Sequence, residues 1–427
     1  MHFVTQNKMK NKIMRTRVLS LSTLLLFFVA NFYAQNLTVR DIMAEPSIAG
    51  MRVEGEKLSP DGTKVVYLWN AEGKMPRDLY LVATTGGPST VILKTSDLPV
   101  PSRPPERENK LDYGVNLRDE FAKARENQLG NFEWSPDSKK LVFTHGGDLY
   151  VMTLEPKAVK RYTRTAGPEA GARFLDNDRI LYSQGGNSFV LNTTDATLAQ
   201  LTREANQQNF ISVGNVVPDK AGKMIAYVVS DGSKQRQLVV PNFLPEYVAG
   251  GGPRRGWSEQ KLYVTPADGS RETPFEIKLP KPEGVANFRR MVWTPDGSGL
   301  IVDRIDKDTK RRQLFYVNNP GGKAEQIITV TEETDHKWQA QLSVIFEPHP
   351  SRPGELFFGS ERDGYNHLYL AKLEAETRAV ASVPDSNARV QEGGMSLSNN
   401  VKITQLTKGN WQVEWAKWAD ARQIIYV

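Results

Sequence analysis

The fold is decided by the stretch Trp134-Ser135-Pro136-Asp137-Ser138-Lys139-Lys140-Leu141-Val142-Phe143. It begins as a tight turn, because Pro136 presets φ for the first central turn position and the Asp137 side chain can accept a hydrogen bond from the backbone two residues on. The turn leads into Leu141–Phe143, which favour a buried strand. A Gly-Gly pair then reverses the chain, and Asp148–Met152 supplies a partner strand. The stretch therefore predicts a β-hairpin that follows a Ser-Pro-Asp turn.

The same unit recurs along the chain at intervals of about 40 residues. The clearest copies are Leu58–Tyr67 and Trp293–Val302, and weaker copies begin at Phe174 and Val217. Several strands within a repeat of this length are typical of a β-propeller blade. We therefore predict an all-β fold for residues 36–427: a seven- or eight-bladed β-propeller of four-stranded antiparallel blades, with a short helical insertion.

Three features refine this prediction. Three blades close at a threonine, in the pairs Tyr162-Thr163, Leu201-Thr202 and Leu406-Thr407. Two apolar runs within residues 262–277 imply a further blade. The sequence ends inside a strand, at Tyr426-Val427. A propeller must close its ring to remove edge strands, so either an N-terminal strand completes the last blade or the sequence is a fragment; we expect a fragment.

The composition argues against several functional classes. The formal net charge of +6 would suit a nucleic-acid-binding protein, but residues 1–35 carry five basic and no acidic side chains, so the remainder is close to neutral. We therefore expect no nucleic-acid partner. The chain contains no cysteine, which excludes disulfides, thiolate metal sites and a cysteine nucleophile within these residues.

Residues 1–35 have the three parts of a secretory signal peptide. A basic region ends at Arg17, an apolar stretch runs from Val18 to Phe32, and the small residue Ala34 offers a cleavage site. The apolar stretch is short for a membrane span, which needs about 20 residues. We predict export to the periplasm or the extracellular space, without stable membrane insertion after cleavage; an uncleaved anchor is the alternative.

An insertion separates the first two predicted blades, at residues 95–131. It opens with several prolines, which cannot form a central strand, and residues 117–129 show a helical pattern. Three carboxylates in it, Asp119, Glu120 and Glu126, are candidates for binding the terminal ammonium of a peptide through charge-assisted hydrogen bonds. The alternative is a solvated helix face, because basic residues are interleaved with them.

Catalytic and metal-binding motifs are missing from the sequence. There is no Gly-x-Ser-x-Gly nucleophile elbow, and the histidines are scattered without the spacing of metal ligands. We expect no metal and no cofactor. The most informative local motif is Ser360–Leu370, in which Asp363 and the following glycine predict a tight turn. We predict that Glu361, Arg362, Asp363 and Tyr365 brace this turn, with a binding role as the alternative.

The Ser-Pro-Asp repeats, the motif Ser360–Leu370 and the segment Gln405–Val413 together resemble the N-terminal propeller of dipeptidyl peptidase IV and its prolyl oligopeptidase relatives. The resemblance covers roughly residues 50–427. It implies a secreted serine peptidase in which the propeller restricts entry and contacts substrate, while a C-terminal α/β-hydrolase domain carries the Ser-Asp-His triad. The family's paired glutamates precede a Trp-Ser-Pro blade start; here only Glu126 matches one of them, so dipeptide release and a less specific oligopeptidase activity both stay open.

Two functional hypotheses follow. The first is the gating, peptide-binding propeller of an exported serine peptidase, inactive without the hydrolase domain that these residues lack. Its partners would be peptide substrates and that domain. The second is a stand-alone TolB-like propeller that binds protein or peptide in the periplasm, because such propellers share the Ser-Pro-Asp repeats.

Overall fold

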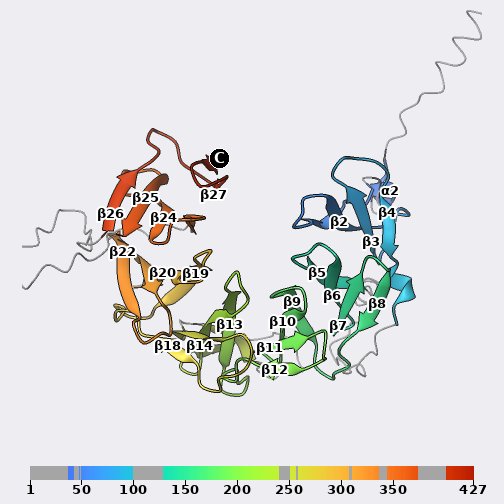
Figure 1. The fold of residues 1–427 in the computed structure, drawn as a ribbon, viewed down its shortest axis with the longest axis horizontal. Coiled ribbons are helices and arrows are strands. Elements are labelled where there is room, and N and C mark those ends of the chain that lie inside the picture. The colour runs from blue at the N-terminus through green and yellow to red at the C-terminus, as the bar shows by residue number, and fades with distance from the viewer. Residues whose placement is uncertain are drawn as a thin grey trace, which may run out of the picture. The chain divides into compact units, whose positions relative to one another are not determined.

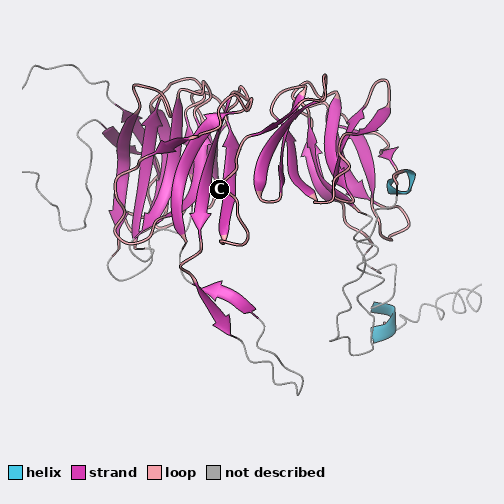
Figure 2. Ribbon diagram, turned by 90° about the horizontal axis from the view of Figure 1, so that it is seen from below, coloured by secondary structure: helices cyan, strands magenta, loops and turns pink. Residues whose placement is uncertain are grey.

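The structure is a computed structural model that describes residues 37–42, 48, 50–99, 128–239, 251–255, 258–306, 310–335, 344–373 and 401–427. Within these ranges the chain forms six four-stranded antiparallel sheets and two two-stranded ones (Figure 1). Strands make up almost all of the regular structure (Figure 2), and the helices are limited to α2 (Val39–Ile42) and the 3₁₀ turn η1 (Thr95–Asp97). The predicted all-β propeller of four-stranded antiparallel blades is confirmed.

The first three sheets each use four consecutive strands. They are β1 (Glu54–Leu58), β2 (Lys64–Trp69), β3 (Asp78–Ala83) and β4 (Thr90–Leu93); β5 (Leu129–Trp134), β6 (Lys140–His145), β7 (Asp148–Thr153) and β8 (Ala158–Arg161); and β9 (Glu169–Phe174), β10 (Arg179–Gln184), β11 (Asn187–Asn192) and β12 (Leu198–Gln200).

The fourth sheet is interrupted by a hairpin. It contains β13 (Ile211–Pro218), β14 (Met224–Asp231), β17 (Glu259–Pro266) and β18 (Phe275–Ile277), and the hairpin consists of β15 (Arg236–Val239) and β16 (Gly251–Arg255). The prediction that residues 262–277 start a blade of their own is therefore wrong. β17 pairs with β14 as the third strand and β18 pairs with β17 as the fourth, and the hairpin between β14 and β17 lengthened the apparent repeat.

The last sheets return to consecutive strands. They are β19 (Asn287–Trp293), β20 (Gly299–Asp306), β21 (Arg311–Asn318) and β22 (Gln326–Thr334); β23 (Phe346–Pro348), β24 (Glu355–Ser360), β25 (His367–Leu373) and β26 (Val401–Gln405); and the two-stranded β27 (Ala416–Trp418) and β28 (Ile424–Tyr426).

A small N-terminal unit, residues 1–54 and 69–75, separates from the rest of the chain. Its helix α2 is capped reciprocally: the Thr38 backbone N–H donates to Asp41 Oδ2 at 2.9 Å, and the Asp41 N–H donates to Thr38 Oγ1 at 3.1 Å. The Trp69 indole donates to the Met51 carbonyl oxygen at 2.8 Å. These contacts order a unit whose helix buries no side chain.

The Ser-Pro-Asp turns form as predicted from their sequence. Ser135 Oγ donates to Asp137 Oδ1 at 2.6 Å and accepts the Lys140 N–H at 2.8 Å, which fixes the start of β6. The same contacts recur at Ser59 and Thr294. Each turn has one residue with positive φ, which is glycine at Gly62 and Gly297 and a strained serine, with φ 61°, at Ser138.

The core lies between consecutive sheets. One apolar cluster joins Val142 and Val151 of the second sheet to Ala172, Ile180 and Leu191 of the third, and similar clusters fill the other junctions. Tryptophans at the ends of inner strands also bond backbone across a junction. Their indole N–H groups donate to a neighbouring sheet at Trp134 to Lys57 O, Trp293 to Val217 O and Trp418 to Glu347 O.

Candidate functional site

The insertion that carries the predicted substrate carboxylates lies mostly outside the described residues, and Asp119, Glu120 and Glu126 all fall there. So does most of the predicted helix over 117–129; its last residue, Leu129, instead opens β5. Both ends of the insertion meet at His145. The ring Nε2 donates to the Pro99 carbonyl oxygen at 3.1 Å, and Leu129 lies opposite His145 in the β5–β6 register.

Polar residues surround this meeting point, and we call them the insertion base: His145, Asp148, Arg161, Thr165, Glu169 and Gln184. Arg161 Nη2 pairs with Asp148 Oδ2, and the Thr165 backbone N–H donates to Asp148 Oδ1 at 3.2 Å. Burial lowers the pKa of His145, so the imidazole is neutral near neutral pH. Sequence reasoning missed this cluster, because its members are spread over five strands and a loop.

Glu169 is the most deeply buried carboxylate of the insertion base, with 3% of its surface exposed. Its Oε1 accepts hydrogen bonds from the Thr165 hydroxyl at 2.6 Å and from Gln184 Nε2 at 3.1 Å. Burial raises the pKa of Glu169, and the hydroxyls of Thr165 and Thr163 offset this only in part. A raised carboxyl pKa favours the neutral acid, which can donate a proton as well as accept hydrogen bonds.

The two sequence motifs singled out above, around residues 360–370 and 405–413, meet at His367. The Leu368 backbone N–H donates to Thr407 Oγ1 at 2.9 Å, so the Thr407 hydroxyl is free to donate to His367 Nδ1 at 3.1 Å. His367 Nε2 then donates to the Gly409 carbonyl oxygen at 2.9 Å. The Trp411 ring packs edge-to-face with the imidazole at 5.0 Å between centroids. Both ring nitrogens are engaged, which leaves no site for a metal or a proton-abstraction step.

Arg362 occupies the centre of the braced turn. Its Nε donates to Ser360 Oγ at 2.8 Å, and its Nη2 donates to Thr331 Oγ1 and Glu333 Oε1, both at 2.9 Å. The guanidinium also lies over the ring of Tyr369 at 4.5 Å. Arg362 therefore links its own turn to β22 of the preceding sheet.

The other three residues predicted in this turn differ in their surroundings. Asp363 Oδ2 accepts a hydrogen bond from Gln405 Nε2, which ties the turn to β26. Burial and the neighbouring Glu333 raise the pKa of Glu361. Tyr365 is exposed, and its ring lies 6.3 Å from that of His367. The structure thus gathers Arg362 and Asp363 into bonded contacts and leaves Tyr365 at the surface.

A buried charged cluster fills the same end of the β19–β22 sheet. Arg312 is fully buried; its Nε donates to Asp303 Oδ2 at 2.7 Å and its Nη1 to the Gly359 carbonyl oxygen at 2.6 Å. Arg304 Nη1 donates to the Pro280 carbonyl oxygen at 2.7 Å, and burial lowers the pKa of Arg304 to about 10. Because each guanidinium already bonds protein acceptors, the cluster is a structural junction and not an open anion site.

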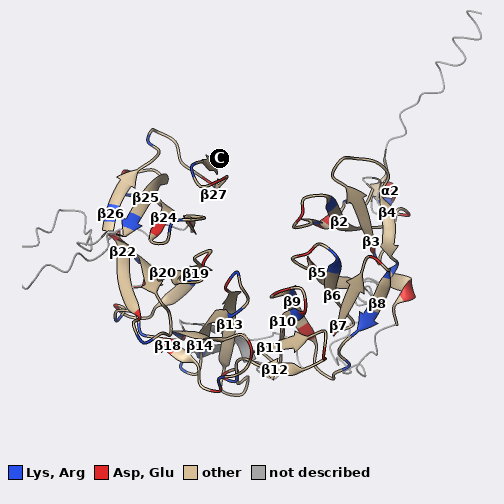
Figure 3. Cartoon of the chain, viewed as in Figure 1, with Lys and Arg blue, Asp and Glu red and all other residues tan. Residues whose placement is uncertain are grey.

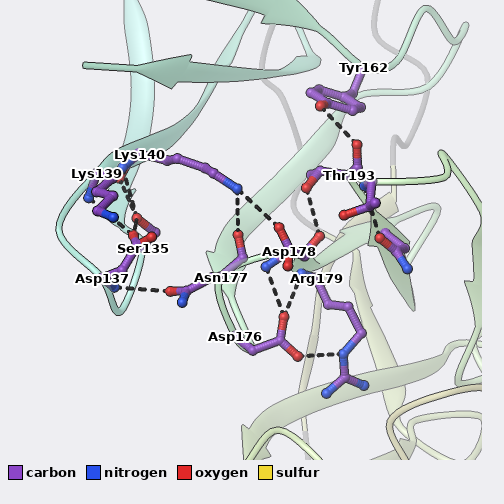
Figure 4. A network of polar contacts seen from close by, with 12 residues as sticks. Ser135, Asp137, Lys139, Lys140, Tyr162, Asp176, Asn177, Asp178, Arg179 and Thr193 are labelled. Atoms are coloured by element: carbon purple, nitrogen blue, oxygen red, sulfur yellow. Dashed lines mark hydrogen bonds and ion pairs between the residues drawn. The ribbon is translucent and has the colours of Figure 1, made fainter. Parts of the chain in front are cut away.

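At the opposite ends of the sheets, the Ser-Pro-Asp turn of the β5–β8 sheet is joined to the turn that contains Asn177 and Asp178 in the next sheet (Figure 4). The Asp137 N–H donates to Asn177 Oδ1 at 3.0 Å, and Lys140 Nζ donates to the Asn177 carbonyl oxygen at 3.0 Å and to Asp178 Oδ1 at 3.1 Å. Although burial opposes it, the hydrogen bond from Ser135 lowers the pKa of Asp137. These turns are structural, because their carboxylates are occupied by local donors.

The described residues do not bring together a set of metal ligands. No group of three or more His, Asp or Glu side chains in these ranges converges as metal ligands would. Positive and negative side chains are both distributed over the sheets (Figure 3). None of the helices in the described ranges is long and apolar enough to cross a membrane.

Comparisons with known proteins identify the relatives of the fold. Residues 253–426 match the family model described as the dipeptidyl peptidase IV (DPP IV) N-terminal region. The chain is similar to the crystal structure of Porphyromonas gingivalis dipeptidyl peptidase 4, with a TM-score of 0.56 and 15% sequence identity over 85% of this chain and 48% of that one. It is also similar to a putative dipeptidyl aminopeptidase IV from Bacteroides ovatus, with a TM-score of 0.55 and 18% identity over 91% and 52%. The chain thus spans about half the length of these two structures.

Proposed function

Because residues 253–426 match the family model of the DPP IV N-terminal region, we propose that the chain is the propeller of an exported serine peptidase of the prolyl oligopeptidase family. In this role it admits and binds peptide substrates for an α/β-hydrolase domain. The family match is the observation that carries the proposal. The fold likeness to two dipeptidyl peptidase structures supports it.

The insertion is the part of the chain that contacts substrate in this proposal. The described residues at its two ends, Pro99 and Leu129, both lie at His145. Asp119, Glu120 and Glu126 lie within that segment and carry the charge that pairs with a peptide ammonium. The nucleophile and oxyanion donors belong to the hydrolase domain, since the sequence has no nucleophile elbow and no cysteine.

Peptide binding by the purified chain tests the substrate role. We expect calorimetry to detect binding of an aminoacyl-proline peptide with a free amino terminus, and Glu126→Gln to weaken it by roughly 30-fold if the charge pair is desolvated, since such contacts are worth about 2–5 kcal/mol. The acetylated peptide should not distinguish the two proteins. Glu155→Gln removes the same charge outside the insertion and should leave affinity unchanged.

Other outcomes would change the proposal. Absence of peptide binding together with tight capture of an intact periplasmic protein would favour the stand-alone TolB-like alternative. Hydrolysis of the peptide by the 427 residues alone, lost on mutation of one of them, would contradict the division of labour with a hydrolase domain.

Export is tested separately. The order of basic, apolar and small residues in 1–35 supports cleavage near Ala34. N-terminal sequencing of the protein recovered from the envelope of its host should begin shortly after this residue. Recovery of the intact leader from the cytoplasm would contradict it.

A further inference from the structure

Glu169 lies at the seam between two sheets. It is the first residue of β9, and its backbone N–H donates to the Gly147 carbonyl oxygen, in the turn between β6 and β7, at 2.7 Å. Its side chain is bonded to Thr165 in the segment that connects the sheets and to Gln184 at the end of β10. The carboxyl group is therefore bonded to its own sheet directly and is linked to the β5–β8 sheet through Thr165, whose backbone N–H donates to Asp148 Oδ1.

The two oxygens of the carboxyl group have unequal surroundings. Oε1 accepts the bonds from Thr165 and Gln184, whereas Oε2 is buried without a hydrogen bond of normal geometry. Glu169 also has no ion pair with a basic side chain among the residues that the structure describes, although it is almost fully buried. An ionised carboxylate in such a place pays for desolvation without an opposite charge, so the protonated form fits better.

Four other ionisable groups face this position from the neighbouring strands. Asp148 on β7 repels an ionised Glu169, and Arg161 on β8 is engaged by Asp148. His145 on β6 is neutral because burial lowers its pKa, and Tyr182 on β10 is neutral because burial raises its pKa to about 12. Arg161 therefore neutralises Asp148 and does not form an ion pair with Glu169.

We infer that Glu169 is a proton-operated latch between the β5–β8 and β9–β12 sheets: it carries a proton when the seam is closed, and the seam loosens when that proton is lost. The direction follows from linkage. Below the carboxyl pKa of the unfolded chain both states are protonated; above it the folded state holds its proton longer, so stability of the seam falls as pH rises through the raised folded pKa. Glu169 is a member of the insertion base, in which His145 also contacts Pro99 and lies opposite Leu129.

Hydrogen exchange with mass spectrometry tests the latch on the intact chain, from about pH 5 to about pH 8. After correction for intrinsic exchange, protection of peptides covering residues 145–150 and 165–184 should fall several-fold with rising pH in the wild type. In Glu169→Gln, which keeps an acceptor oxygen and cannot ionise, protection should not change with pH. Asp137→Asn, at the opposite end of the β5–β8 sheet, is the matched control and should keep the wild-type pH response.

A second readout does not depend on a variant. Infrared spectra of the wild type with isotope-labelled glutamate should show the band of a neutral, buried carboxylic acid at a pH above the usual pKa of glutamic acid, which is about 4.3. Its loss with rising pH should parallel the loss of protection. A wild type without that band, or identical pH profiles for wild type and Glu169→Gln, would overturn the inference.

Discussion

The β23–β26 and β19–β22 sheets are neighbours of the same topology, yet they are closed at one end by different chemistry. In β23–β26 a single hydroxyl, that of Thr407, satisfies the Leu368 N–H and His367 Nδ1 within one sheet. In β19–β22 the corresponding end is filled by buried charges, and Arg312 reaches across to the Gly359 carbonyl oxygen of the next sheet. We call the contacts of Thr407 the neutral closure and those of Arg312 the charged closure. The neutral closure stabilises its own sheet, whereas the charged closure also couples two sheets.

The neutral closure is the recurrent solution in this chain. Thr163 accepts the Leu149 N–H at 2.8 Å in the β5–β8 sheet, and Thr202 accepts the Ser188 N–H at 2.8 Å in the β9–β12 sheet. In each case the threonine follows the fourth strand and bonds the second residue of the third strand. The threonines noticed at the ends of the predicted blades therefore have a physical role, which is to cap a backbone donor that would otherwise be buried without a partner.

Removing the charge of Arg312, which couples the two sheets, should cause the largest loss of stability. Arg312→Met keeps most of the side-chain volume but leaves Asp303 and Glu333 without this counter-charge, and breaking a buried ion pair costs about 3–5 kcal/mol. We expect the urea midpoint of unfolding to fall accordingly. Exchange of backbone amides should rise in both the β19–β22 and β23–β26 sheets.

The control for this variant lies in the adjacent sheet. Arg352 forms an exposed pair with Glu355, and Arg352→Met should cost only about 0–1 kcal/mol. Equal losses of stability in Arg312→Met and Arg352→Met would show that the buried ion pairs of Arg312 contribute no more than an exposed ion pair.

Removing the neutral closure should have a smaller effect that stays within one sheet. Thr407→Val leaves the Leu368 N–H and His367 Nδ1 buried without their partner, at a cost of about 1–3 kcal/mol. Thr407→Ser keeps the hydroxyl and should lose under about 1 kcal/mol. Faster exchange of the Leu368 amide in the valine variant alone would support this; faster exchange that spreads into β19–β22 would contradict the local nature of the closure.

Replacing Arg362 by lysine, which keeps the positive charge but changes the shape of the group, should lower stability less than Thr407→Val does. Arg362→Lys keeps a positive charge near Glu333 but cannot bond Ser360, Thr331 and Glu333 at once, so we expect a loss of about 1–2 kcal/mol in urea unfolding. Arg352→Lys makes the same exchange at an exposed site and should be near neutral. If both lysine variants match the wild type, the fork geometry of Arg362 does not contribute to the junction.

Much of the fold could be predicted because it is encoded locally. The Ser-Pro-Asp turns depend on bonds between residues two to five apart, and the strands that follow them are continuous apolar runs. The error at residues 262–277 arose where this locality fails. The β15–β16 hairpin separates two strands that pair with each other, and the residue pattern alone does not tell an interrupted blade from two blades.

The candidate site was less predictable, since its residues meet only through the tertiary fold. Glu169 opens a strand and reads as an ordinary polar boundary residue, yet it is buried, and its backbone bonds the turn at Gly147 in the neighbouring sheet. Arg304 and Arg312 lie on strands where charged residues normally face solvent. The only sequence signal is that acidic and basic residues are mixed over 303–312 and that two glutamates follow at 332–333.

The smallest change in stability is expected at the opposite ends of the two sheets. There, too, a charged group stabilises a turn in one sheet and a neutral contact does so in the other. In β19–β22, Asp296 Oδ1 accepts hydrogen bonds from Thr294 Oγ1 and the Ser298 N–H, whereas in β23–β26 His349 Nδ1 accepts the Ser351 and Arg352 N–H groups. Burial works against it, but these hydrogen bonds lower the pKa of Asp296. The folded state thus prefers ionised Asp296, and this stabilisation is present above the unfolded pKa of about 3.9 and is lost as pH falls through the folded value.

Asp296→Asn should therefore be less stable than the wild type by under about 1 kcal/mol near neutral pH, because the amide oxygen accepts the same bonds more weakly than a carboxylate. The difference should vanish as the pH falls below the folded pKa of Asp296, where the wild type also loses its charge. Exchange of the Ser298 amide measures this locally, and the Arg352 amide, bonded to an imidazole and not to a carboxylate, provides the internal reference. A constant difference at every pH would mean that the shape of the side chain, and not its ionisation, holds the turn.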